Sequence, residues 1–299
     1  SVPEAKVTGS KVRVGSSSWP KSIKENLLLV DKSFILPQIV DNDDPILLTR
    51  PRRFGKTMCL TMFEDFFGVP RGETLEEKKA RYKDMKIGAD PEFIKKHCGQ
   101  HPVIRLDLKA SFHIKLFKRL DMLLWSFPEV QEEIDMSKKN LSPSEEKKLS
   151  HLQAMLNREW KLMETNIIYC TEVLLSLVLF LNAYYGRACI LLIDEFDTPI
   201  INADEDSRDA IKNRIRDMLA PIVKTTEGLL LRCVMVSVNP VSLAEMASGL
   251  NNFSALSLHS ASHEPYPDDI LKSGDMLYQI TFGFTEDEVR KLIATHVFP

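Results

Sequence analysis

The sequence has no CxxC pair, no long uninterrupted apolar run and no large excess of either sign of charge. Its five cysteines are odd in number and widely scattered, which argues against a disulfide framework or a zinc ribbon and favours an intracellular compartment, cytoplasm or nucleus. With 39 Lys and Arg against 42 Asp and Glu, the surface as a whole is not built to coat nucleic acid. The 299 residues, 44% of them hydrophobic, are enough to bury a full core.

Membrane and export signals are also missing. The sequence opens at Ser1 without a basic-then-apolar leader, so we expect no secretion signal and no membrane partner. Residues 173–193 are apolar at most positions, but Gly186 and Arg187 divide them into runs too short to cross about 30 Å of hydrocarbon. We predict a buried helix over residues 173–181, a turn, and a buried strand over residues 189–193.

Short apolar runs separated by helix-like segments dominate the rest of the chain. The runs are residues 46–48, 103–108, 189–193 and 229–238. Because a parallel sheet is covered on both faces, its strands read as continuous apolar runs, so the pattern predicts an α/β sandwich. Residues 1–20 are predicted to be a flexible segment and residues 21–280 the core. Charge patterning predicts solvated helical faces at residues 73–86 and in a helical insertion at about 111–165.

The strongest local signal follows the first apolar run and reads Arg50-Pro51-Arg52-Arg53-Phe54-Gly55-Lys56-Thr57-Met58. It meets the last three positions of the phosphate loop G-x-x-x-x-G-K-[ST], with Arg50 in place of the first Gly. Gly55 lets a phosphate approach the backbone, Lys56 supplies charge to the β and γ phosphates, and Thr57 offers a hydroxyl to Mg²⁺. Helical spacing of apolar residues over 58–67 fits a phosphate at a helix N-terminus. The alternative is a surface turn with a solvated lysine.

A second signal is the apolar run at residues 189–193, which ends in two acids, Asp194 and Glu195. Buried strands deliver their C-terminal residues to the crevice where open α/β sheets bind ligands, so Asp194 is expected to emerge beside the loop and hold Mg²⁺. Glu195 is expected to orient and deprotonate an attacking water. The alternative is a strand that ends in a polar loop, with Asp197 capping a helix at Thr198 and Pro199.

Other polar residues allow more than one interpretation. Asn239, or else Ser237, follows the last apolar run and is a candidate to contact the γ phosphate, although an ordinary turn before Pro240 explains it nearly as well. Arg52 and Arg53 suit phosphate binding, contact with a neighbouring subunit, or pairing with nearby acids. His97 and His101 flank a thiol at metal-like spacing, but Gly99 interrupts the helix, so we expect no metal site there.

Four ordered motifs resemble one family of phosphate-loop proteins, the AAA-ATPase-like family. They are residues 50–57, 193–199, 239–252 and 282–289, and the resemblance spans about residues 20–295. It implies a three-layer, mainly parallel AAA-like fold in which an Arg-initiated loop replaces the Gly-initiated form, with residues 281–299 as the truncated start of a helical lid. Family members commonly carry a C-terminal nuclease-like domain, and some resemble host-directed effectors of the Crinkler kind. The chain departs from the family around Asn239.

The leading hypothesis is a Mg²⁺-dependent ATPase that hydrolyses the β–γ bond, with ATP and Mg²⁺ as cofactors and catalysis by positioning and electrostatics. Catalysis is assigned to Glu195 and Lys56, the metal to Thr57 and Asp194, and the nucleotide to residues 50–58 and Asn239. The second hypothesis is an ATP-binding switch with little turnover that regulates a missing C-terminal domain or a partner. A third is nucleic-acid binding through the lysines of residues 78–86, 95–96 and 115–119. A homo-oligomer is left open.

Overall fold

The computed structural model describes residues 6–11, 17–41, 45–109, 167–225, 228–238, 254–257 and 284–296. A five-stranded parallel sheet with the order β4-β5-β6-β3-β7 lies at its centre. The strands are β3 (Ile46–Thr49), β4 (Val103–Asp107), β5 (Cys189–Asp194), β6 (Leu230–Ser237) and β7 (Ser254–Ser257). The first four coincide with the four apolar runs of the sequence, which confirms the prediction of a parallel sheet. Strand β7 was not predicted, because Ser254 and Ser257 make its sequence half polar.

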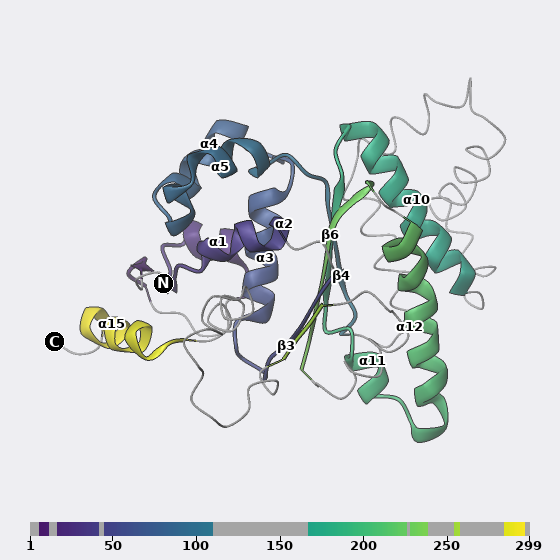
Figure 1. Ribbon diagram of the computed structural model, residues 1–299. Coiled ribbons are helices and arrows are strands. Elements are labelled where there is room, and N and C mark those ends of the chain that lie inside the picture. The colour runs from purple at the N-terminus through teal and green to yellow at the C-terminus, as the bar shows by residue number, and fades with distance from the viewer. Residues whose placement is uncertain are drawn as a thin grey trace, which may run out of the picture.

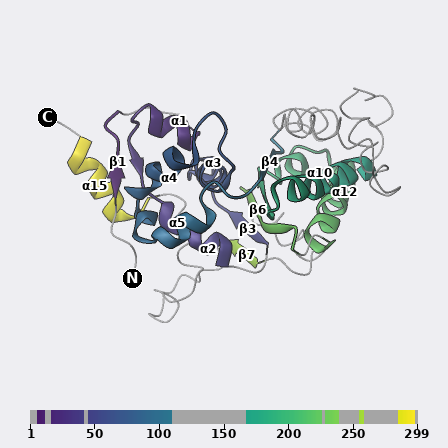
Figure 2. The ribbon, with the colours of Figure 1, turned by 90° about the horizontal axis from the view of Figure 1, so that it is seen from above.

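Helices cover both faces of the sheet, so the fold is a three-layer α/β sandwich (Figure 1). Every residue of β5 is buried, as expected for a strand enclosed between two helical layers. One layer holds α10 (Ile167–Tyr185), α11 (Thr198–Ile201) and α12 (Glu205–Thr225). The other holds α1 (Trp19–Lys24), α2 (Leu36–Asp41), α3 (Lys56–Phe67), α4 (Leu75–Lys83) and α5 (Pro91–His97), and the two layers remain separate when the molecule is viewed from above (Figure 2).

Helix α10 is the apolar helix that the sequence predicted before β5. Leu174, Leu177 and Leu181 are fully buried against the sheet and α12. The chain then turns at Gly186, whose φ of +61° is in the left-handed region that glycine tolerates best. The predicted order of helix, turn and strand is therefore confirmed. Across the ranges that the structure describes, no helix has the length and apolarity needed to cross a membrane.

Helix α3 fixes the phosphate-loop motif to the core. Its inner side is aromatic: Phe63, Phe66 and Phe67 are completely buried. The rings of Phe66 and Phe67 meet edge to face, with centroids 5.0 Å apart, and Phe66 meets Tyr82 of α4 in the same way at 4.9 Å. Since such pairs are worth about 0.5–1.5 kcal/mol beyond their area burial, the helix has a well-defined position. The loop that precedes α3 is thereby held at the carboxyl end of β3.

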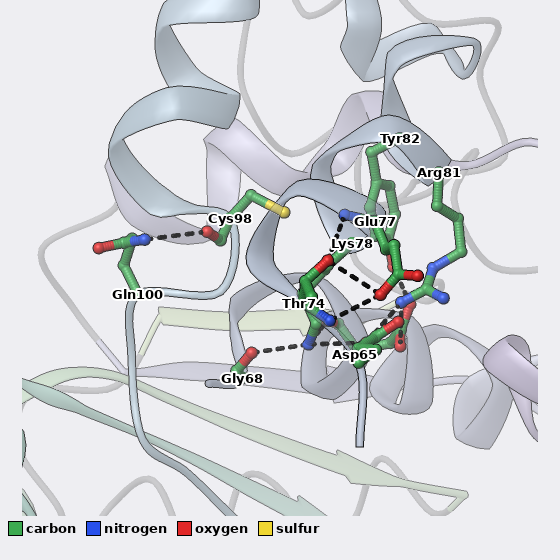
Figure 3. A network of polar contacts seen from close by, with 10 residues as sticks. Asp65, Gly68, Thr74, Glu77, Lys78, Arg81, Tyr82, Cys98 and Gln100 are labelled. Carbon is green, nitrogen blue, oxygen red and sulfur yellow. Dashed lines mark hydrogen bonds and ion pairs between the residues drawn. The ribbon is translucent and has the colours of Figure 1, made fainter. Parts of the chain in front are cut away.

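Helix α4 has the solvated face that its charge predicted, and it also has a buried side. Lys78 and Tyr82 are buried. Figure 3 shows Lys78 donating to the carbonyl oxygens of Asp65 and Gly68, each at 2.7 Å, where α3 ends. The Tyr82 hydroxyl donates to Asp65 Oδ2 at 2.6 Å. Glu76, Glu77 and Lys83 are exposed as predicted, but charge patterning does not distinguish such residues from Lys78, which satisfies carbonyls at the end of a neighbouring helix. Lys78 is thus not available to bind nucleic acid.

The N-terminal part of the chain is joined to the last described helix. Strand β1 (Val7–Thr8), within the segment predicted to be flexible, pairs antiparallel with β2 (Leu29–Val30). After β2 come the short helix η1 (Ser33–Ile35) and α2, while η2 (Lys86–Ala89) lies between α4 and α5. Helix α15 (Glu286–His296) lies beside β1 (Figure 2). The buried Lys32 ammonium donates to both carboxylate oxygens of Glu288, at 2.7 and 2.8 Å.

Candidate functional site

The loop between β3 and α3 is exposed from Pro51 to Gly55, and its backbone is shaped by two left-handed residues. Arg53 has φ +67° and Gly55 has φ +75°. A Cβ added to Gly55 would meet no atom within 4 Å, so the space beside this residue is open. Helix α3 starts at Lys56, and the backbone bond from Cys59 N to Gly55 O leaves the earlier N–H groups without an intrahelical acceptor. Such an N-terminus favours an anion.

Lys56 lies inside this loop rather than in solvent. Its side chain is buried, and Nζ donates to the carbonyl oxygens of Arg50 at 2.9 Å and Pro51 at 2.8 Å. Burial lowers the pKa of Lys56, whereas the negative charges of Asp194 and Glu195 act to raise it. The lysine at the end of the loop therefore binds the carbonyl oxygens at its start, and it lies near the acids at the end of β5. The alternative of a surface turn with a solvated lysine is excluded.

Arg50 contributes to the loop mainly through its backbone. Its N–H donates to Ser237 O at 3.1 Å, which extends the pairing of β3 with β6 by one residue, and its carbonyl accepts from Lys56. The guanidinium is buried and donates from Nη1 to Thr49 O at 2.7 Å. Arg52, Arg53 and Phe54, in contrast, have exposed side chains around the loop. Met58, in the first turn of α3, is partly buried.

Asp194 joins the two motifs of the sequence. It ends β5, is 3% exposed, and its Oδ2 accepts from Thr57 Oγ1 at 2.8 Å. No group within the described part of the chain bonds to its Oδ1, which is also buried. Burial raises the pKa of Asp194, and the hydrogen bond from Thr57 opposes that rise. The structure thus brings Thr57 and Asp194, the two expected metal ligands, into direct contact.

Glu195 follows in a strained backbone conformation. Its φ is +51°, a value that costs a non-glycine residue of the order of 1–3 kcal/mol and is found at functional sites. Both carboxylate oxygens have neighbours: Thr198 Oγ1 donates to Oε2 at 3.2 Å, and Lys109 Nζ lies 3.8 Å from Oε1. The turn at Glu195 directs the chain away from the line of β5. The expected base therefore stands next to Asp194 and is held by two polar groups.

Asp197 has the helix-capping position that the alternative interpretation gave it, but a different bonding partner. It precedes α11, yet its side chain makes no cap bond; its Oδ2 accepts from Val238 N at 3.0 Å, after the end of β6. The carboxylate is fully buried. Asp197 thus fixes the spacing between the ends of β5 and β6. Ser237 is buried at the end of β6, and Asn239, the expected γ-phosphate contact, lies outside the described residues.

One acid of the site was missed by sequence reasoning. Asp107 ends β4 and pairs in register with Asp194 of β5. Its charge is one of those that raise the pKa of Asp194. A weaker signal was present, because residues 103–107 are apolar except for Arg105 and end in an acid, as β5 does. A cavity of about 340 Å³ begins at Thr57 on the same side of the sheet and extends past Glu64 to Arg105 of β4.

His97 and His101 form a buried pair on the amino-terminal side of the sheet. Nδ1 of His97 lies 3.2 Å from Nε2 of His101, and Nδ1 of His101 lies 3.0 Å from Ala188 O, just before β5. The carbonyl can only accept, so it sets the tautomers: His101 donates to Ala188 and His97 donates to His101. Burial lowers the pKa of His97 to about 4. Both histidines are therefore neutral at physiological pH.

These features define a phosphate-loop α/β protein, and comparison with known families agrees. The family described as "Predicted AAA-ATPase" matches residues 13–247, and this chain belongs to that family. The chain is also similar to a curated protein of Azotobacter chroococcum mcd 1, described as "Uncharacterized protein in vnfD 5'region", with 24% identity over 294 residues. That alignment covers 95% of this chain and 45% of the relative, so the chain spans about half the length of the relative.

Proposed function

We propose that this protein is a Mg²⁺-dependent nucleoside triphosphatase that hydrolyses the β–γ bond of ATP. Family membership supports nucleotide binding in general. The observation that carries the finer proposal is the 2.8 Å hydrogen bond between Thr57 Oγ1 and Asp194 Oδ2. A hydroxyl in the first turn of the helix that follows the phosphate loop and a carboxylate at the carboxyl end of a strand in the same sheet are the oxygen ligands that Mg²⁺ takes beside nucleotide phosphates.

The residues present fit both the metal and the nucleotide. Asp194 Oδ1 is buried and lacks a hydrogen-bond partner in the described structure, so a cation would satisfy it. The open space at Gly55 and the N–H groups at the start of α3 suit a phosphate. Bound Mg²⁺ would neutralise charge that develops on the phosphates. In this proposal Thr57 and Asp194 hold the metal, and residues 50–58 surround the triphosphate.

Lys56 and Glu195 have separate roles in the proposed reaction. The Lys56 ammonium, now bonded to the carbonyls of Arg50 and Pro51, would turn to the phosphate oxygens, which are stronger acceptors because they are charged. Glu195 would orient a water and accept its proton at a carboxylate oxygen. Arg52 and Arg53, exposed on the loop, would add positive charge near the phosphates. Catalysis in such a site comes from positioning and electrostatics.

Two substitutions test the proposal because they affect different steps. Lys56→Ala should weaken ATP binding about 10- to 100-fold, the value of a charge-assisted hydrogen bond of about 1.5–3 kcal/mol. Glu195→Gln should bind ATP as the wild type does and lose about 10²–10⁴-fold in turnover, the usual contribution of a general base. Lys95→Ala, at an exposed lysine on α5, is the matched control for loss of positive charge. Wild-type hydrolysis in both test variants would refute the mechanism.

A second candidate function is an ATP-binding switch with little turnover. The contacts of Glu195 favour it, because Thr198 and Lys109 engage both oxygens of the carboxylate that must accept the proton. A single-turnover assay beside a binding titration separates the candidates. Tight binding of ATP with negligible release of phosphate supports the switch, and product formed in the first turnover supports the enzyme.

A further inference from the structure

Two neighbouring strands of the sheet, β4 and β5, each end in an aspartate at the same level. Strands β4 and β5 are parallel, and Asp107 is the register partner of Asp194. Side chains alternate along a strand, so Asp107 shares a face with Val103, and Asp194 with Leu192. Val103 and Leu192 belong to the core cluster on the α3 side. Both carboxylates therefore rise on the α3 side, where neighbouring strands are about 4.8 Å apart.

Three carboxylates lie close together at this end of the sheet. Glu195 follows Asp194 directly in the chain, and Asp107 is the register partner of Asp194. The nearby cations also have other partners: Lys56 bonds to loop carbonyls, and Arg105 Nε lies 2.6 Å from Glu64 Oε2. Lys109 Nζ lies 3.8 Å from Glu195 Oε1, and the backbone N–H of Lys109 donates to Asp107 Oδ1 at 2.9 Å. Two like charges in neighbouring positions are costly unless a cation lies between them or one is protonated.

An independent observation points to a ligand at the pair. Asp194 is only 3% exposed, and its Oδ1 has no hydrogen-bond partner among the described residues. A buried carboxylate oxygen without a hydrogen-bond partner is unfavourable, so such atoms mark the place of an ion or a water. Thr57 Oγ1 adds a third oxygen, because it already contacts the other oxygen of Asp194.

We propose that Asp107 is a second carboxylate of the metal site, so that Asp107, Asp194 and Thr57 together bind a divalent cation before any nucleotide arrives. The donors are all hard oxygens, which select Mg²⁺ or Mn²⁺ over thiolate- and imidazole-seeking metals. In the described structure no three side chains of His, Cys, Asp or Glu gather to enclose a metal, so water and later nucleotide phosphates complete the coordination. The inference rests on the proposed function for the identity of the metal.

A metal site with one carboxylate and a metal site with two carboxylates should differ in their affinity for the metal when no nucleotide is bound. A single carboxylate and a hydroxyl hold Mg²⁺ only when phosphates supply further ligands, whereas a second carboxylate adds a full negative charge to the empty site. Metal affinity in the absence of nucleotide is therefore the quantity to measure. It reports on Asp107 without requiring turnover.

The experiment titrates the full 299-residue chain with Mn²⁺ in the absence of nucleotide and follows the loss of the free Mn²⁺ signal by electron paramagnetic resonance. We expect one bound Mn²⁺ that Mg²⁺ displaces, and an increase in Kd of at least tenfold for Asp107→Asn. Asp209→Asn, which removes an exposed carboxylate on α12, is the matched control and should bind Mn²⁺ as the wild type does. If Asp107→Asn does not fold, Asp107→Ser takes its place.

Two results would overturn the inference. One is a wild-type chain that binds no Mn²⁺ without nucleotide, and the other is an Asp107 variant with wild-type affinity beside an Asp194→Asn variant that has lost it. ATP binding and hydrolysis are measured on the same wild-type sample. If the chain hydrolyses ATP but binds no Mn²⁺ in the absence of nucleotide, the proposed function is supported and the role of Asp107 as a metal ligand is refuted. Mn²⁺ binding without ATP binding supports the two-carboxylate site and refutes the nucleotide function.

Discussion

Thr57 Oγ1 lies 2.8 Å from Asp194 Oδ2, although 137 positions separate the two residues in the sequence. The hydroxyl comes from the first turn of α3 and the carboxylate from the last residue of β5. Their contact joins the phosphate-loop motif to the two acids that follow β5, at the carboxyl ends of the strands. It also makes the hydroxyl of Thr57 the most informative single group to change.

Thr57→Val should weaken the dependence of ATP binding on Mg²⁺, because one of the proposed metal ligands is lost. The substitution keeps the shape of the side chain but deletes the hydroxyl, and it leaves buried Asp194 Oδ2 without its donor, at a cost of about 1–3 kcal/mol in stability. Thr57→Ser keeps the hydroxyl and should keep the dependence. Titration of ATP with Mg²⁺ and with EDTA checks the pair. An equal effect of Mg²⁺ on wild type and Thr57→Val would contradict the role given to this residue.

Acid should destabilise the protein through the buried histidine pair. The pKa of His97 is about 4 in the folded state against an ordinary 6.5, so between these values the unfolded chain binds more protons. Stability is then complete above pH 6.5 and falls as the pH drops toward 4, by about 2 kcal/mol at pH 5. Urea unfolding at pH 7.5 and pH 5.0 measures the difference. His97→Gln should reduce it, and an undiminished loss in this variant would assign the acid sensitivity to other groups.

The ion pair between Lys32 and Glu288 should contribute strongly to the docking of α15. Both side chains are buried, and Glu288 Oε2 also accepts from Thr285 N at 2.8 Å at the start of the helix. Lys32→Met or Glu288→Gln alone should cost about 3–5 kcal/mol, because each leaves a buried polar partner uncompensated. The double variant Lys32→Met/Glu288→Met should cost clearly less than the sum of the two single losses. Additive losses in urea unfolding would show that the two residues act separately.

Lys78→Met should loosen the end of α3 that lies away from the loop. Its ammonium satisfies the carbonyl oxygens of Asp65 and Gly68, and the loss of both bonds should cost about 2–4 kcal/mol. Lys83→Met, at an exposed lysine at the end of the same helix, should change stability by less than about 0.5 kcal/mol. Thermal unfolding of the two variants makes the comparison. Equal midpoints would mean that the two bonds of Lys78 drawn in Figure 3 add nothing to stability.

Four of the five strands of the sheet and the helix after the loop were predictable from local patterns. Strands β3, β4, β5 and β6 appear in the sequence as apolar runs, since a parallel strand is buried on both faces. Arrangements that depend on distant partners were not predictable. The charges of α4 indicated a solvated face, yet Lys78 is buried because the end of α3 offers it two carbonyls. The alternative interpretation had Asp197 capping a helix, and Asp197 does precede α11, yet its side chain bonds to the chain after β6.

By itself the sequence determined that a lysine-bearing loop follows one buried strand and that two acids follow another, because these are local properties of neighbouring residues. Only the tertiary structure decided that Thr57 contacts Asp194, that Asp107 stands in register beside it, and that Lys56 closes the loop. Register and strand order bring together residues far apart in the chain, and no local preference of the sequence specifies them. The sheet order β4-β5-β6-β3 therefore accounts for the composition of the site.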